Sequence, residues 1–154
     1  MKKYLSSEMK RDNEYEALLN YLLQKCDRFE TIIRTDIISD ETTDDKLNQA
    51  LNELQPFLVS KIQGTEWHVN EISEGSVEIY TYQFNRKTLS IFLSYTDCFT
   101  DWQAPNFFED ISFFRFNSNQ YILSVIGHEN LFFWQIDDAE YQDLQKLGIE
   151  LCLN

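Results

Sequence analysis

The chain has 154 residues, of which 26 are Asp or Glu and 13 are Lys or Arg, so its formal net charge is −13. This excess of acid argues against a protein that binds nucleic acid directly or lies on an anionic membrane, because both need a basic face. With 43% hydrophobic and 15% aromatic residues, a chain of this length can bury a full core without a metal or a disulfide. We therefore expect a single globular domain over residues 1–154.

The N-terminus predicts no secretory signal, because no apolar stretch follows Lys2 and Lys3. The apolar runs are far shorter than the roughly 20 residues that span a bilayer. Cys26, Cys98 and Cys152 form no C-x-x-C pair, which indicates free thiols in a reducing compartment. We expect a cytoplasmic protein with no cofactor and no metal.

The first third of the chain is predicted to hold two helices and a strand. Residues 8–26 carry one apolar helix stripe, formed by Tyr15, Leu18, Leu19, Leu22, Leu23 and Cys26. A β-prone run follows at 29–34. After the polar, acidic stretch 35–45, Thr42 and Asp45 resemble a capping box that opens a second helix, which should end near Pro56.

The middle of the chain favours strands at 58–69, broken by Gly64, and at 77–84. The run 89–95 is ambiguous. Its apolar residues alternate as in a strand, but they also fit one helix face with Asn85 as the N-cap, and periodicity alone does not decide between the two. Residues 97–108, which include Trp102 and Pro105, read as a long loop.

Aromatic-rich runs at 111–116, 121–127 and 131–136 are joined by short connectors, which predicts an antiparallel meander. Asp137 and Glu140 form a capping pair for a last helix, which Gly148 closes, and residues 149–153 alternate as a final strand. The fold class is therefore α+β: an antiparallel sheet packed against three to four helices.

The common catalytic motifs are absent from the sequence, and four glycines are too few for a phosphate-binding loop. Cys98 or Ser124 with His128 could form a nucleophilic site in the folded chain. A serine within a sheet and a histidine in a polar turn explain the same residues more simply. We therefore favour a protein without catalytic activity.

Acidic residues concentrate in two segments, with six acids against one base at 35–60 and ten against two at 95–154. In the second segment Trp102 stands in an acidic loop and is expected to be an exposed anchor for a basic partner, among Asp97, Asp101, Glu109 and Asp110. Asp36, Asp40, Asp44 and Asp45 form a second candidate surface. They could hold a cation, but their spacing is not that of an EF-hand loop, and capping with solvation explains them. Solubility alone also explains the acidic excess.

Consecutive aromatic residues in the predicted meander, Phe113–Phe114 and Phe132–Phe133–Trp134, place apolar side chains on both faces of the sheet. Either helices cover the second face, or some of these rings form an exposed partner site.

Two regions resemble small proteins from Gram-positive bacteria, some of which carry the name of a sporulation-stage protein. They are LNYLLQKCDRF at 19–29 with IIR at 32–34, and FFEDISFFR at 107–115 with SVIGHE at 124–129. The resemblance implies no particular activity, but it favours a helix at 85–95. In size, acidity and lack of motifs the chain is also similar to immunity proteins that neutralise bacterial toxins.

Two functions follow as hypotheses. The first is a protein-binding module of the immunity or inhibitor type, whose acidic face binds a basic protein partner. The alternative is a small-ligand-binding protein or a hydrolase with a pocket near Arg115 and His128. Arg34 and Arg115 each end an apolar strand, where an arginine either clamps a carboxylate or phosphate or pairs with an acid of the chain.

Overall fold

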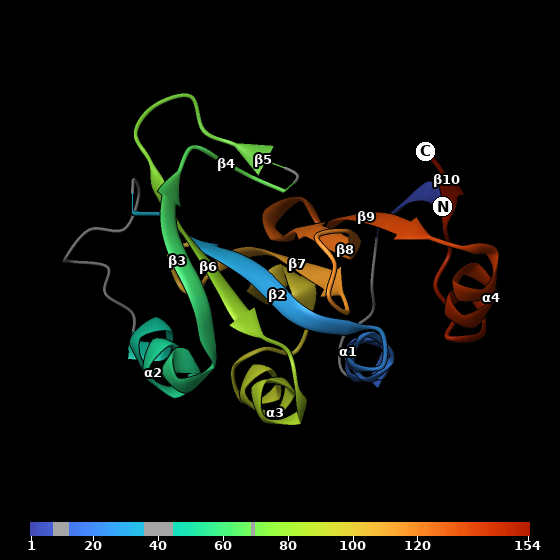
Figure 1. Cartoon of the computed structure of the whole chain (residues 1–154), viewed down its shortest axis with the longest axis horizontal. Helices are drawn as coiled ribbons and strands as arrows, with labels where there is room; N and C mark the ends of the chain where they lie inside the picture. The colour runs from blue at the N-terminus through green and yellow to red at the C-terminus, as the bar shows by residue number, and fades with distance from the viewer. Residues whose placement is uncertain (8–12, 36–44, 69) are drawn as a thin grey trace.

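The computed structural model describes residues 1–7, 13–35, 45–68 and 70–154. Within these residues the fold is α+β, as predicted, with four α-helices and a large antiparallel sheet (Figure 1). The helices are α1 (Asn13–Leu23), α2 (Asp45–Leu54), α3 (Arg86–Tyr95) and α4 (Asp138–Lys146), and three 3₁₀ turns are η2 (Gln55–Phe57), η3 (Phe99–Asp101) and η4 (Gly127–Glu129). None of the described helices combines the length and the apolar composition needed to cross a bilayer.

The main sheet has eight strands in the order β10-β1-β9-β8-β7-β2-β6-β3, with every neighbouring pair antiparallel. Its strands are β1 (Lys2–Ser7), β2 (Cys26–Ile33), β3 (Leu58–Gly64), β6 (Val77–Gln83), β7 (Glu109–Arg115), β8 (Tyr121–Ile126), β9 (Leu131–Ile136) and β10 (Cys152–Leu153). The predicted meander is confirmed as β7–β8–β9. A separate hairpin is formed by β4 (Glu66–Trp67) and β5 (Asn70–Glu71).

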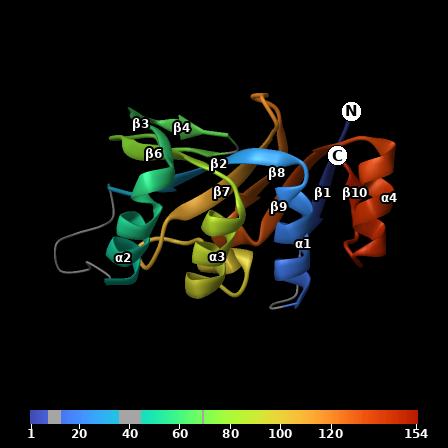
Figure 2. The same ribbon diagram turned by 60° about the horizontal axis from the view of Figure 1, so that its bottom comes forward.

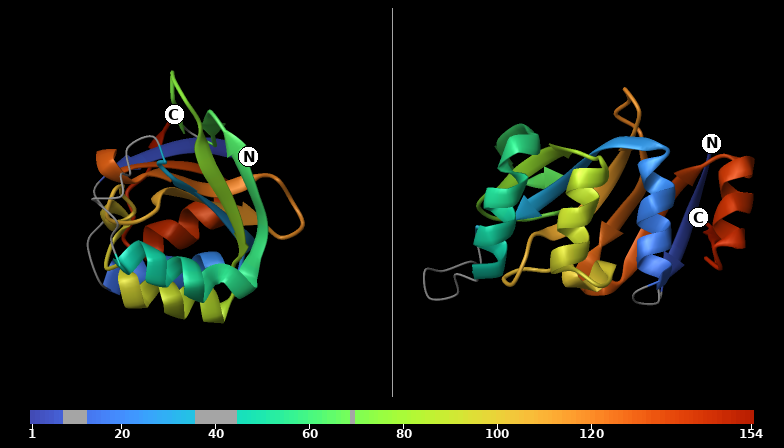
Figure 3. Two further views of the ribbon diagram at one scale, coloured as in Figure 1. Left: turned by 90° about the vertical axis from the view of Figure 1, so that its left-hand side faces the viewer. Right: turned by 90° about the horizontal axis from the view of Figure 1, so that it is seen from below.

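All four helices lie on one face of the sheet, in the order α2, α3, α1, α4 (Figures 2 and 3). The main core is formed between this helical layer and the sheet, and it is rich in aromatic side chains. No described helix covers the opposite face, over which the β4–β5 hairpin lies instead (Figure 1). Phe113 is buried in the main core, whereas Phe114 lies on the opposite face, where His68 from the hairpin packs on its ring.

The capping signals in the sequence predicted the starts of α3 and α4 correctly. Asn85 caps α3 in a capping box with Thr88, so the ambiguous run is a helix, as the resemblance favoured. Asp137 and Glu140 form the predicted capping box of α4, and Gly148 follows that helix with a φ of +85°. A side chain rarely adopts this left-handed conformation, which is why glycine suits the position.

Other boundaries differ from the prediction. Helix α1 ends at Leu23 rather than Cys26, because Cys26 already pairs with Arg115 in the sheet. Strand β1 was not predicted, and β10 is shorter than the predicted 149–153. Both strands depend on partners far away in the sequence, which local patterns do not reveal.

Candidate functional site

The clearest candidate site is a groove between the helix-free face of the sheet and the β4–β5 hairpin. It contains two cavities that share Glu30 and His68. The larger, of about 430 Å³, is lined by Glu30, Ile62, Glu66, Trp67, His68 and Ile79. The smaller, of about 260 Å³, is lined by Arg28, Glu30, His68, Thr81, Phe114 and Asn119. We call the two together the hairpin groove.

The alternation of β2 explains why a carboxylate lies at the floor of this groove. Phe29 and Ile33 belong to the main core on the helical side, so Glu30 between them faces the other side of the sheet. In the sheet register Glu30 stands between Thr81 of β6 and Ser112 of β7. A charged residue therefore sits on a central strand, where apolar side chains are usual.

Glu30 is partly buried, and burial raises the pKa of its carboxyl above the ordinary value, although a hydrogen bond from the backbone N–H of His68 lowers it. No ion pair joins Glu30 to a basic side chain of the described residues. Arg28, two residues away on the same strand, instead contacts the Asp27 carboxylate at 3.4 Å and donates to the carbonyl of Ser118.

His68 does not supply the missing positive charge. Its ring packs edge-to-face on Phe114 and Tyr121, with centroid distances of 5.2 and 4.5 Å. Desolvation lowers the pKa of His68 below its ordinary 6.5, so the imidazole is neutral at neutral pH. The groove thus presents a partly buried carboxylate that forms no ion pair with a basic side chain of the described residues, although Arg28 lines the smaller cavity.

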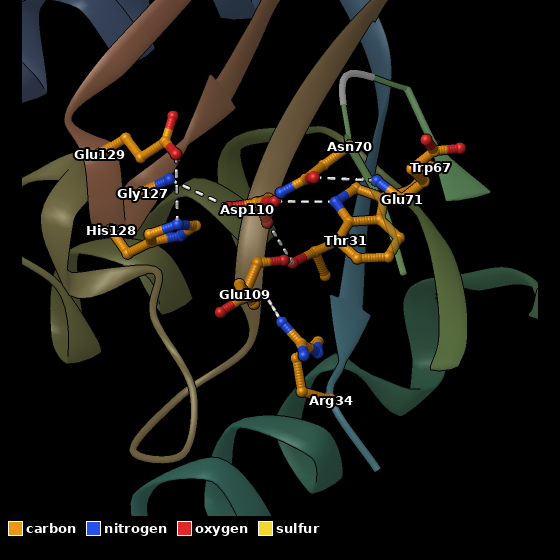
Figure 4. A network of polar contacts seen from close by, with 10 residues as sticks. All are labelled: Thr31, Arg34, Trp67, Asn70, Glu71, Glu109, Asp110, Gly127, His128 and Glu129. Atoms are coloured by element: carbon orange, nitrogen blue, oxygen red, sulfur yellow. Dashed lines mark hydrogen bonds and ion pairs between the residues drawn. The ribbon is translucent and has the colours of Figure 1, made fainter. Parts of the chain in front are cut away.

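The hairpin is held in place by a buried carboxylate, Asp110 (Figure 4). Its Oδ2 accepts a hydrogen bond from Trp67 Nε1 at 2.7 Å, and its Oδ1 accepts one from the backbone N–H of Gly127 at 3.0 Å. Thr31 Oγ1 donates to the backbone carbonyl of Asp110 at 2.5 Å. Burial raises the pKa of Asp110 to about 6 even though both N–H donors lower it.

The predicted exposed anchor, Trp102, is wrong: its side chain is 0% exposed. The loop folds into the core, where the indole packs on the rings of Phe92 and Phe107 with ring-centroid distances of 5.0 and 4.9 Å. Its Nε1–H donates to the hydroxyl of Tyr15 at 3.0 Å. A large aromatic surface gains more from this burial than it would from contact with solvent.

The acids predicted around Trp102 do not form one surface. Glu109 and Asp110 are 4% and 2% exposed, and Glu109 pairs with Arg34 at 2.8 Å. Asp97 is exposed, while the carboxylate of Asp101 accepts hydrogen bonds from the backbone N–H groups of Asp97 and Cys98. The prediction of an acidic face around Trp102 is therefore wrong for two of its four acids, Glu109 and Asp110.

The second acidic candidate surface falls largely outside the part of the chain that the structure describes. Asp36, Asp40 and Asp44 lie outside the described residues, as do Thr42 of the predicted capping box and the side chain of Asp45, which begins α2. The remaining part of the chain holds no cluster of three side chains of the types that bind metals.

The structure does not bring Arg115 and His128 together, although a shared pocket was expected near them. His128 follows β8 at the end where β7 begins, whereas Arg115 ends β7. The two ends of β7, Glu109 and Arg115, are six positions apart, which corresponds to roughly 20 Å along the strand. Arg115 instead binds both carboxylate oxygens of Glu140 at 2.8 Å, and His128 lies at the surface 3.6 Å from Glu129.

The two predicted nucleophiles are buried, so neither is accessible to a substrate. Ser124 is fully buried, and its hydroxyl forms a hydrogen bond of 2.5 Å with the hydroxyl of Ser112. Cys98 is buried and contacts the hydroxyl of Thr100.

Arg34, the other arginine predicted to clamp a ligand, lies at the same end of β7 as His128 (Figure 4), but its guanidinium is bound to Glu109.

Sequence reasoning missed Glu30, Trp67 and His68. One signal was available for Glu30, since it is an acid between Phe29 and the β-branched residues Thr31 and Ile32, in a run otherwise suited to a buried strand. Trp67 and His68 gave no comparable signal, because the hairpin that carries them reaches the groove only through the tertiary fold. No family model, no curated protein and no solved structure matches the chain.

Proposed function

We propose that this chain is a non-enzymatic binding protein of the immunity or inhibitor type, and that its hairpin groove receives a cationic side chain of a basic protein partner. One observation carries the proposal. Glu30 is a partly buried carboxylate at the floor of an open groove, and no basic side chain of the described residues pairs with it. A carboxylate that has lost part of its hydration and has no ion-pair partner gains most from a cation that binds there.

The surroundings of Glu30 suit an arginine or lysine side chain in particular. Ile62 and Ile79 provide an apolar floor for its methylene groups, and Ile62 is 59% exposed, so the groove is accessible from β3. Glu66 at the rim, with Glu71 and Glu74 nearby on the hairpin and its following turn, adds negative charge. The overall charge of −13 would speed the approach of a basic partner.

A cytoplasmic location, in which Cys26, Cys98 and Cys152 stay free, belongs to the same proposal. The similarity in type to toxin-neutralising immunity proteins and the resemblance to small proteins of Gram-positive bacteria agree with it. The alternative of a ligand pocket at Arg115 has less support, because Glu140 already occupies that guanidinium.

The test uses a small cation in place of the unidentified partner. Butylguanidinium mimics an arginine side chain, and butylurea is its neutral counterpart. Trp67 lies in the groove, whereas Trp102 and Trp134 are buried in the main core, so the three indole N–H signals in an NMR spectrum separate groove binding from general effects. We expect butylguanidinium to shift the Trp67 signal alone and butylurea to shift none.

Glu30→Gln keeps an acceptor for the His68 N–H but removes the charge, and it should weaken butylguanidinium binding about tenfold or more. Glu16→Gln removes the same charge from an exposed position on α1, on the helical side, and should change binding little. Binding should also tighten as the pH rises through the raised pKa of Glu30, because only the ionised carboxylate attracts the cation. Equal shifts with butylurea, or equal losses in both variants, would refute the proposal.

A further inference from the structure

The outer edge of β3 is a second candidate surface, because no described strand pairs with its outward backbone groups. β3 is the last strand of the eight-stranded sheet. Five consecutive residues, 59–63, are exposed. Such an edge offers a row of free backbone N–H and C=O groups to another strand. At the other end of the sheet β10 has only two residues.

Natural proteins usually protect a long edge with charges, proline or a bulge. Here Pro56 lies before the strand, in η2, and the register shift falls between Leu58 and Ser60, at its start. The one charged side chain, Lys61, is turned toward β6, with its ammonium 3.5 Å from Glu78 and 5.4 Å from the centre of the Tyr80 ring. Within the described residues, no charge, proline or bulge therefore protects the edge from Ser60 to Gly64.

Exposed apolar side chains mark the same strand. Val59 and Ile62 are 50% and 59% exposed, and they are two of the five large hydrophobic residues exposed in the described part of the chain. Strand addition combines main-chain hydrogen bonds with contacts of alternate side chains, so an edge that carries exposed apolar residues can supply both.

Charge decides which occupant fits. Glu78 on the neighbouring strand is already paired with Lys61, but Glu66 follows β3 by two residues, and Glu71 and Glu74 are exposed on and after the hairpin. A second copy of this chain would bring another net charge of −13 against the first, which like-charge repulsion disfavours. A basic segment would instead meet opposite charge along this edge.

We infer that the β3 edge binds an extended, basic segment of a protein partner by antiparallel or parallel strand addition. This goes beyond the proposed groove function, because the edge lies two strands away from Glu30 and needs no contact with that carboxylate. The segment adds a ninth strand to the sheet, and its alternate side chains lie beside the exposed apolar residues of β3.

The experiment measures hydrogen exchange of the β3 amides by NMR in the full chain. In the free protein alternate amides of β3 should exchange quickly, because in an antiparallel edge strand every second residue points its N–H away from β6. The probe is a seven-residue peptide of alternating lysine and valine with blocked ends. At a concentration of about ten times its Kd it should slow those amides about tenfold.

Three controls separate strand addition from other binding. The same peptide with N-methylated alternate residues keeps its charge but loses backbone donors, and a glutamate–valine peptide reverses the charge, so neither should protect the amides. Ser60→Lys places a repelling charge on the exposed edge and should weaken the peptide about tenfold, whereas Phe116→Lys, at a position 55% exposed in the turn after β7, should not.

Glu30→Gln should leave the peptide's protection of β3 unchanged, which distinguishes this inference from the groove function. Equal protection by the N-methylated peptide would overturn strand addition, and so would equal losses in Ser60→Lys and Phe116→Lys. Outward amides that are already protected in the free chain, with a dimer by sedimentation, would show that a second copy occupies the edge and would overturn it too.

Discussion

Replacing Asp110 with Asn tests how the buried carboxylate that holds the hairpin affects stability. Burial raises the pKa of Asp110 from its ordinary 3.8 to about 6. Because the folded state prefers the protonated form, Asp110 contributes most to stability below pH 3.8, and this contribution is lost as the pH rises through about 6. The shift corresponds to about 3 kcal/mol in total, of which about 2 kcal/mol is lost between about pH 4.5 and about pH 7.5.

The assay is urea unfolding of the wild-type protein and Asp110→Asn at several pH values in this range. The variant loses one hydrogen bond at every pH, since its amide NH₂ must face either Trp67 Nε1–H or the Gly127 N–H. The wild-type free energy of unfolding minus that of the variant removes the effects of all other titrating groups. This difference should fall by about 2 kcal/mol as the pH rises from about 4.5 to about 7.5.

Glu16→Gln, at an exposed position on α1, controls for the change in net charge. A difference between wild type and Asp110→Asn that stays constant, or grows with pH, would refute the reasoning. It would mean that the two N–H donors stabilise the carboxylate at least as much as burial destabilises it.

Further substitutions test the close packing at Gly127 and the ion pair between Arg115 and Glu140. In Gly127→Ala the added Cβ would lie 2.1 Å from the carbonyl oxygen of Trp102, so we expect a loss of at least about 3 kcal/mol by urea unfolding. In Gly75→Ala nothing lies within 4 Å and only the φ of +75° is unfavourable, so about 1 kcal/mol is expected, and equal losses would contradict the steric argument. Arg115→Met leaves the Glu140 carboxylate buried without its cation and should cost about 3–5 kcal/mol. The double variant with Glu140→Leu should recover most of that loss, and no recovery would show that the ion pair is not the cause.

The parts of the fold that were predicted correctly depend on neighbours in the sequence. The capping boxes at Asn85 and Asp137 place their side chains three residues from the groups they bind. The short connectors of the β7–β8–β9 meander leave few other ways to pair its strands. The α+β class follows from the same local patterns.

The parts that were missed depend on contacts between distant segments. Trp102 stands in a polar, acidic stretch, yet it is buried because its ring fits among side chains of α3 and the following loop. Arg34 and Glu109 are 75 residues apart, and no spacing rule connects them. The candidate site has the same character, since Glu30 comes from β2 and the side chains that wall it come from the later hairpin.

The sequence by itself determined the strong negative charge, the α+β class, the helix caps and the alternation that turns Glu30 away from Phe29. These features are set by composition and by interactions within a few residues. The tertiary structure decided which acids remain on the surface and which are buried, where the hairpin lies, and which sheet edge stays unpaired. The reason is physical: burial and ion pairing depend on which distant segments pack together, and that choice is made by the whole core.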